Sequence, residues 1–209
     1  LVNNGIEKSV EDEDMNESEE NSNLGVDIIV PHISNILIYF REKFQREAKT
    51  GKRNNEFFNL TELNILSRMS EYVTFSEESS VLFNLLIASI NKKQDEETQL
   101  QTLKTANVLA KHIKAYDSKT LTSLAPLFGQ IFYRPSRIEL CDILSKVYQN
   151  NHLSKMISQI NTFSSKNPDQ PNYNVRLEAF KSIKQLIEEE DFNIEFSLIL
   201  TYNCCYFIY

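Results

Sequence analysis

The sequence predicts an all-α fold, an α-solenoid of irregular helix pairs, from three observations. Apolar residues recur at helical spacing along most of the chain, and no strand-like alternation continues beyond a few residues. The 209 residues include only 4 Gly and 5 Pro, too few for the tight turns that a β protein needs. Each helical segment has one apolar face and is followed by a short break, so each needs neighbours that cover this face.

The stretch from Leu60 to Ile90 shows the pattern most clearly. Its first half carries an apolar stripe, made by Leu63, Leu66, Met69 and Val73. Its second half carries another, made by Leu82, Leu85, Leu86 and Ile90. Ser76 is expected to cap the second helix, because acidic residues follow it in the first turn. We expect the two helices to run antiparallel and to bury their stripes against each other.

A first helix is predicted from Val26 to Lys49. Its apolar stripe is made by Ile29, Ile33, Ile36, Leu37, Phe40 and Phe44. The end of this helix and the turn after it form a basic cluster, which consists of Arg41, Lys43, Arg46, Lys49, Lys52 and Arg53. Exposed cations of this kind bind RNA phosphates. The same charges also complement the C-terminal end of a helix dipole, so both interpretations stand.

Six more helices are predicted after the central stretch, which makes about nine in all. They are expected at residues 96–114, 118–131, 136–149, 153–163, 172–190 and 192–209. Asp95 is expected to cap the first of them, and Pro126 is expected to kink the second. Helix pairs that start near residues 26, 76, 117, 151 and 192 repeat every 34 to 50 residues or so, roughly the spacing of irregular HEAT-type pairs.

The N-terminal segment carries the net charge of the whole chain. Residues 1–24 hold eight acidic residues and one Lys, so their charge of −7 equals that of the complete sequence. This segment has too few apolar residues to offset its ordering entropy. We therefore predict a disordered acidic segment over residues 1–24 and HEAT-like repeats, cut at the C-terminal end, over 25–209. The acidic segment is interpreted as a solvated linker, a tether for basic partners or a phosphorylated region.

The catalytic inventory is thin. The three His residues fall on separate segments, and the 4 Gly residues are too far apart for a phosphate-binding loop. The three Cys residues lack disulfide or zinc spacing and are interpreted as reduced core thiols. The apolar closing run includes Asn193, Glu195 and Asn203, so a core helix is favoured over a membrane span. We expect no enzyme, catalytic residue, cofactor, metal, membrane or small-molecule substrate.

Three blocks look familiar as a set. The first is ELNILSRMSEYVTFSEESSVL, which ends at Leu82 and is followed by Glu96-Glu97-Thr98 and a helix. The second runs from Phe128 to Leu140 and contains Arg134, Ser136 and Arg137. The third joins Tyr173, Arg176, Leu177, Ala179 and Phe180 to the closing YNCCYFI, Tyr202 to Ile208. In this order and spacing the blocks resemble the small-subunit processome component twenty family, also called "down-regulated in metastasis".

The resemblance implies an internal piece of a very large nucleolar HEAT-repeat protein. It implies a non-catalytic scaffold of the small-subunit processome, which supports pre-rRNA processing and assembly of the small ribosomal subunit. The implied partners are pre-rRNA, snoRNA and other assembly factors, and the implied location is the nucleolus within the nucleus. The alternative is a HEAT-type transport or adaptor scaffold that binds protein partners only. An enzyme of unknown type is a third, weaker alternative.

Overall fold

The computed structural model describes residues 27–49, 58–73, 77–90, 94–113, 118–148, 151–164, 166–167, 170–188 and 194–208. Over these ranges it contains nine α-helices and no β-strand, which confirms the all-α, solenoid-like prediction. The helices are α2 (Ile33–Lys49), α3 (Leu60–Ser70), α4 (Glu77–Ser89), α5 (Glu96–Ala110), α6 (Ser118–Gln130), α7 (Arg134–Val147), α8 (Asn151–Ile160), α9 (Tyr173–Glu188) and α10 (Ile194–Ile208). The predicted acidic segment, the basic residues after Lys49 and the predicted cap Ser76 lie outside the described residues.

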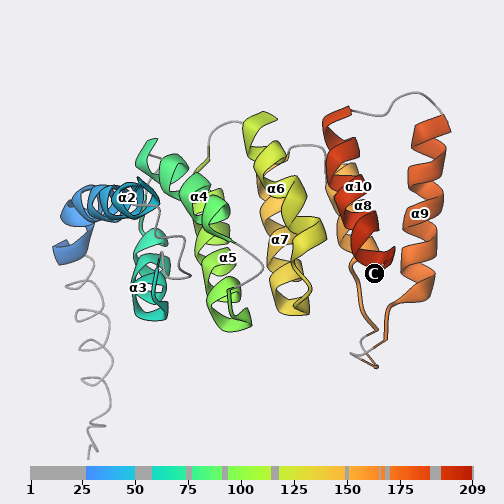
Figure 1. Cartoon of the computed structure of the whole chain (residues 1–209), viewed down its shortest axis with the longest axis horizontal. Helices are drawn as coiled ribbons and strands as arrows, with labels where there is room; N and C mark the ends of the chain where they lie inside the picture. Colours follow the sequence, from blue (N-terminus) through green and yellow to red (C-terminus); the bar gives the residue numbers. More distant parts are fainter. Residues whose placement is uncertain are drawn as a thin grey trace, which may run out of the picture.

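The helices form two layers (Figure 1). In one layer α2 packs on α4, α4 on α6 and α6 on α10. In the other, α3 packs on α5, α5 on α7, α7 on α8 and α8 on α9. Contacts of α4 with α5 and of α6 with α7 join the layers. The helices inside each layer therefore bury one face against neighbours on either side, which is the arrangement that a single apolar stripe requires.

The predicted pairing of α3 with α4 is wrong. α3 packs chiefly on α5, where the hydroxyl of Thr105 donates to the Leu63 carbonyl at 3.2 Å, while α4 packs on α2, α5 and α6. The stripe residues themselves were identified well, because Leu63, Leu66, Leu82 and Leu86 are all fully buried. The error concerns the helices against which these stripes pack. Successive helices of a solenoid alternate between layers, so a stripe can face the helix two positions along the chain.

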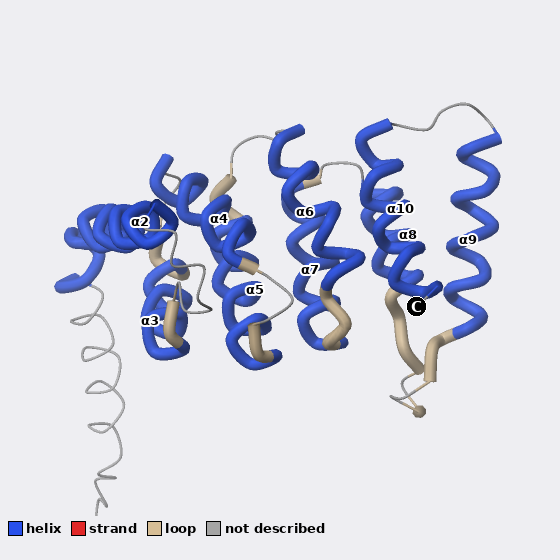
Figure 2. Tube along the Cα trace, viewed as in Figure 1, coloured by secondary structure: helices blue, strands red, loops and turns tan. Residues whose placement is uncertain are grey.

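The last three helices depart from simple alternation (Figure 2). α8 continues the layer of α7, α9 lies beyond α8, and α10 returns to pack on α6. Gly129 of α6 permits this close approach, because a Cβ atom there would lie 3.2 Å from Cδ1 and 3.3 Å from the carbonyl oxygen of Tyr202. The return covers Phe196 completely and packs Phe207 against the core. Phe196 and Phe207 of the closing run are therefore covered, fully and partly, by other residues of this chain.

Local sequence signals set several helix starts. The carboxylate of Asp95 accepts from the Thr98 amide at 2.8 Å, which confirms the predicted cap of α5 and lowers the pKa of this carboxyl. Asn59 forms a capping box with Glu62 at the start of α3, a cap that we did not predict. α7 begins at Arg134, two residues earlier than expected, because proline fits the first turn of a helix.

The first long helix begins later than predicted, because a proline interrupts the residues before it. Pro31 lies in a 3₁₀ turn, η1 (Val30–His32), which separates residues 27–29 from α2. Proline supplies no N–H and its ring disturbs the preceding turn, so a regular helix restarts only after it. Ile33, Leu37 and Phe40 of the predicted stripe are buried, whereas Ile29, before the proline, is 40% exposed.

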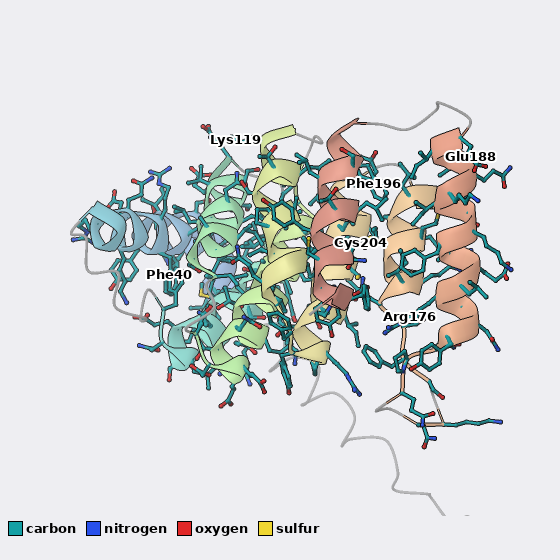
Figure 3. The ribbon with its side chains drawn as sticks, turned by 45° about the vertical axis from the view of Figure 1, so that its right-hand side comes forward. Phe40, Lys119, Arg176, Glu188, Phe196 and Cys204 are labelled. Carbon is teal, nitrogen blue, oxygen red and sulfur yellow. The ribbon has the colours of Figure 1, made fainter. Side chains whose placement is uncertain are left out.

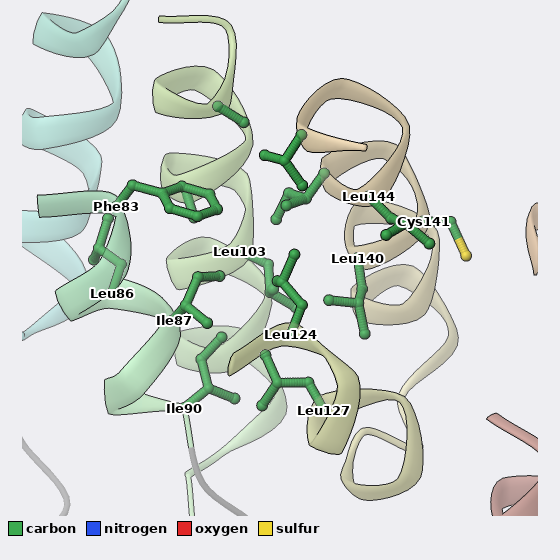
Figure 4. Close-up of a cluster of buried hydrophobic side chains, with 14 of the residues drawn as sticks. Phe83, Leu86, Ile87, Ile90, Leu103, Leu124, Leu127, Leu140, Cys141 and Leu144 are labelled. Carbon is green, nitrogen blue, oxygen red and sulfur yellow. The ribbon is translucent and has the colours of Figure 1, made fainter. Parts of the chain in front are cut away.

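One hydrophobic core runs through the described helices. Figure 4 shows its centre, where Phe83 and Ile87 of α4 face Leu103 of α5 and Leu124 of α6. The outer face of α9 is different. Tyr173, Leu177, Phe180 and Ile187 follow helical spacing and are 70%, 54%, 39% and 53% exposed. This end of the array thus presents an apolar stripe to the solvent.

Candidate functional site

The predicted basic cluster lies at the C-terminal end of α2, and the structure describes only part of it. Arg41 is half-buried and Arg46 is exposed, with its Nε donating to the Glu42 carbonyl at 3.2 Å. Lys43 forms an ion pair with Glu62 of α3, so it links two helices. The side chain of Lys49 and the residues Lys52 and Arg53 lie outside the described part.

A second group of cations lies where α6, α7, α8 and α10 meet. Arg137 of α7 is 1% exposed, and all three of its guanidinium nitrogens donate hydrogen bonds. Nη1 donates to the carbonyls of Phe128 and Ile131, at 2.8 and 2.7 Å, at the end of α6. Nε donates to Asn161 after α8 at 2.9 Å, and Nη2 donates to Asn203 of α10 at 2.7 Å. One side chain thus joins four helices.

All acceptors of Arg137 are neutral amide oxygens, and its aromatic neighbour is a tyrosine ring. Its Cζ atom lies 3.5 Å from the centroid of the Tyr206 ring, which is a cation–π contact. Burial lowers the pKa of Arg137 to about 10, and the nearby charge of Arg176 acts in the same direction. Even so, the guanidinium remains charged at neutral pH, so a full positive charge is held inside the fold by dipoles and a π face.

Two more arginines line a pocket beside the hydrogen bonds of Arg137. Arg134 begins α7 and Arg176 lies in the first half of α9, on the side that faces the array (Figure 3). Their Cζ atoms lie 4.0 and 4.8 Å from the centroid of the same Phe163 ring, and Cζ of Arg176 also lies 4.9 Å from that of Phe207. Residues from four segments line this open pocket of about 380 Å³, namely Phe132, Arg134, Phe163, Pro171, Arg176, Tyr206 and Phe207.

The loop between α8 and α9 positions the shared ring. Phe163 forms an isolated antiparallel bridge with Pro171, and flanking backbone bonds run from Ser164 to Gln170 and from Asn172 to Thr162. The Nε atom of Arg176 donates to the Thr162 carbonyl at 3.1 Å, which ties α9 to this loop. The pocket is therefore built from residues far apart in sequence but fixed by hydrogen bonds.

Two arginines, Arg134 and Arg176, line the pocket. Burial lowers the pKa of Arg176, and the charge of Arg134 lowers it further. Nη2 of Arg176 is shielded from water and has no hydrogen-bond partner among the described residues.

Sequence reasoning listed these residues without recognising the site. Arg134 and Arg137 belong to the second familiar block, and Arg176, Tyr206 and Phe207 belong to the third. One feature of the sequence could have indicated the site. Each of the three arginines stands in an otherwise apolar segment and has no nearby Asp or Glu on the same helix face. The structure adds what a linear pattern cannot give, namely that residues of α7, α9 and α10 line one pocket.

The described residues contain no group of three His, Cys, Asp or Glu side chains that is arranged to hold a metal ion. None of the helices described is long and apolar enough to cross a membrane. The closing run that raised this question is α10, whose Phe196, Ile199 and Asn203 are completely buried within the helical array.

Comparison with protein families decides where the chain belongs. The family described as "U3 small nucleolar RNA-associated protein 20, N-terminal" matches residues 2–209, nearly the whole sequence. The chain belongs to this family. Membership confirms the resemblance carried by the three sequence blocks, and it connects the chain with the small-subunit processome, with ribosome biogenesis and with rRNA processing in the nucleolus. No solved structure matches the chain.

Proposed function

We propose that this chain is part of a non-catalytic scaffold that supports pre-rRNA processing and small-subunit assembly within the processome. The family match over residues 2–209 is the observation that carries the proposal. The two-layered helical array supports it, because stacked repeats offer long surfaces on which several partners bind at once. The proposed partners are pre-rRNA, the U3 snoRNA and other assembly factors, and the proposed place of work is the nucleolus.

We propose in addition that the end of α2 contacts RNA through phosphates. Arg41 and Arg46 are the described residues best suited to this contact, since Lys43 is already paired with Glu62. Phosphate contacts position a protein on RNA without reading its sequence. The last residues of the predicted cluster, Lys49, Lys52 and Arg53, extend the same charge along the chain.

Co-purification of the full-length protein tests the proposed function. The tagged protein should recover precursor rRNA and the U3 snoRNA far above the level obtained with a tagged transport receptor of similar helical repeats. Depletion of the protein should cause unprocessed precursor of the small-subunit rRNA to accumulate. Recovery of protein partners without these RNAs, together with normal processing after depletion, would instead support the adaptor alternative.

A further inference from the structure

We propose that the exposed face of α9 docks an amphipathic α-helix of another assembly factor, a helix with apolar residues at heptad spacing and a carboxylate at its middle. This face, at the edge of the array, is called the α9 seam (Figure 1). Its members are Tyr173, Leu177, Phe180, Lys184 and Ile187. The inference goes beyond the proposed RNA contacts and rests on the proposed scaffold function only for the kind of partner.

The spacing of the α9 seam is the first argument. Its five residues follow one another at intervals of four, three, four and three positions. This is the heptad repeat by which one α-helix packs along another. The four apolar members are exposed, and exposed polar side chains of the same helix lie beside them, namely Asn174, Glu178, Lys181, Gln185 and Glu188. An apolar patch with a polar border is typical of a surface that binds another protein.

The charge of Lys184 is the second argument, and it states what the docked helix carries. Lys184 lies between Phe180 and Ile187 along the seam, and its Nζ is 3.6 Å from a carboxylate oxygen of Glu188. This ion pair is longer than a hydrogen bond and both side chains are exposed, so it contributes little and can exchange partners. A carboxylate on the docked helix would meet Lys184 among apolar side chains, where water screens the attraction less.

The position of the seam is the third argument. Arg176 lies one turn before Phe180, and its Cζ is 4.9 Å from the Phe207 ring centroid of α10, so the seam runs along the edge of α9 nearer to α10. In the described chain the layer of α10 holds four helices and that of α9 holds five. A helix docked on the seam would therefore take the next place beside α10.

The same lysine favours a separate protein over a further helix of this polypeptide. The described buried residues, which form the seams inside the array, include no Lys, Asp or Glu. A charged residue in the middle of a seam lowers its stability and fixes its register, which suits a partner that binds and leaves. α10, the helix that follows α9 in the chain, packs on α6 instead.

The α9 seam is held in place before a partner arrives. Ala179 and Ile183 on the opposite face of α9 are buried, and Nε of Arg176 donates to the Thr162 carbonyl at 3.1 Å. Docking therefore orders few groups of this chain. Leu177 and Ile187 offer a nucleic-acid base no ring to stack on, so the seam as a whole favours a helix over RNA.

The test uses the full-length protein and a fluorescein-labelled synthetic peptide of about three heptads, at concentrations where the peptide alone is monomeric. The Glu probe carries Leu at the heptad core positions and one Glu at the central one; the Lys probe carries Lys there. Fluorescence anisotropy should show that the parent binds the Glu probe about tenfold more tightly than the Lys probe, and Lys184→Glu should reverse this preference. Leu177→Ser should weaken binding of the Glu probe about tenfold.

Matched controls change the same kinds of group elsewhere. Ile65→Ser removes an apolar side chain that is exposed on α3, and Lys104→Glu reverses an exposed charge on α5. Both should leave the affinities for the two probes unchanged. Circular dichroism melts of all four variants should coincide with that of the parent, because none of these side chains is buried.

A footprint of the free protein tests whether the seam is open. Tyr173 of the seam is 70% exposed and Tyr72, outside it, is 46% exposed. Hydroxyl radicals should therefore oxidise Tyr173 of the free full-length protein at least as fast as Tyr72. The Glu probe should protect Tyr173 and leave Tyr72 unchanged.

Each outcome decides the question. Absence of binding, or affinities that neither Leu177→Ser nor Lys184→Glu changes, would overturn the inference. Protection of Tyr173 in the free full-length protein would overturn it by showing that the same polypeptide covers the seam. Binding of a fluorescent oligouridylate that Leu177→Ser abolishes would overturn it in favour of RNA. Recovery of precursor rRNA by the same preparation would show that the proposed scaffold function survives any of these failures.

Discussion

At the scale of single residues, Arg137 is the side chain on whose contacts the stability of the fold depends most. A buried cation is costly unless its donors are satisfied, and here four neutral acceptors and one ring take the place of water. Replacing Arg137 with Met keeps the volume but leaves these buried acceptors without donors. We expect Arg137→Met to lower the free energy of unfolding by about 3 to 5 kcal/mol, measured by urea denaturation. Arg68→Met, at an exposed position, is the control, and equal midpoints for the two variants would contradict this role.

Cys141, one turn along α7, makes a prediction about pH. Burial raises the pKa of this thiol from 9.0 to about 12. A group whose pKa is higher in the folded state stabilises the fold below its unfolded pKa, and this contribution is lost as the pH rises from about 9 to about 12. Between pH 9 and 11 the free energy of unfolding should therefore fall more steeply in the parent than in Cys141→Ala. Denaturation at several pH values measures this difference, and parallel curves would refute it.

At the scale of the helix, α4 tests the packing of the array. Leu86 is completely buried (Figure 4). Its neighbour Leu85 is only partly buried and packs against the core. Leu86→Ala should cost about 2 to 5 kcal/mol of stability, because the surrounding helices cannot close the cavity completely. Leu85→Ala should cost clearly less. Chemical denaturation of both variants checks the order, and a larger loss for Leu85→Ala would mean that α4 is turned about its axis.

α2 offers a prediction about binding. Neutralising Arg46, Lys52 and Arg53 together should flatten the salt dependence of RNA binding by about two units, at roughly 0.7 per phosphate contact on single strands. Lys43 is left unchanged because its ion pair with Glu62 joins α2 to α3. A salt titration by fluorescence anisotropy measures the slope. If the slopes of parent and variant coincide, the cluster only complements the helix dipole.

The sequence was informative about helices and much less so about their neighbours. Apolar spacing located all nine helices of the described chain, and the pattern around Asp95 identified a cap that the structure contains. Helix ends shifted where Pro31 and Pro135 stand, because proline sets where a helix can begin. Which faces meet is decided by tertiary packing, so the partners of α3 and α4 and the return of α10 could not be deduced from a stripe.

The candidate site shows the same limit at the scale of the whole molecule. A run of cations such as the one at the end of α2 is visible in sequence, because its members are neighbours in the chain. The pocket of Arg134 and Arg176 is not, since it exists only where the start of α7, the α8–α9 loop and the end of α10 meet. Its two arginines were recognised as members of familiar blocks, yet nothing in their linear spacing gave them a common role.

The return of α10 also changes how the molecule should unfold. In a simple solenoid each repeat contacts only its neighbours, and local openings stay local. Here Asn203 of α10 accepts from both Arg137 and Asn161, at 2.7 and 3.0 Å, so α10 is tied to α7 and to the end of α8. Asn203→Ala leaves two buried donors without an acceptor, which costs about 1 to 3 kcal/mol each. We expect amide hydrogen exchange to accelerate together in α6, α7, α8 and α10 while α3 and α4 keep the exchange rates of the parent.

Hydrogen-exchange mass spectrometry resolves these segments, and Asn84→Ala, an exposed position on α4, serves as the matched control. Two results would contradict the coupling. Acceleration confined to α10 would mean that the last helix opens alone and that Arg137 finds other acceptors in its absence. Acceleration that extends equally to α3 would mean that the described array unfolds as one unit, because the core from α4 to α7 transmits the loss to every layer. The expected pattern lies between these two results, since α10 packs on α6 and α8 whereas α3 packs on α5.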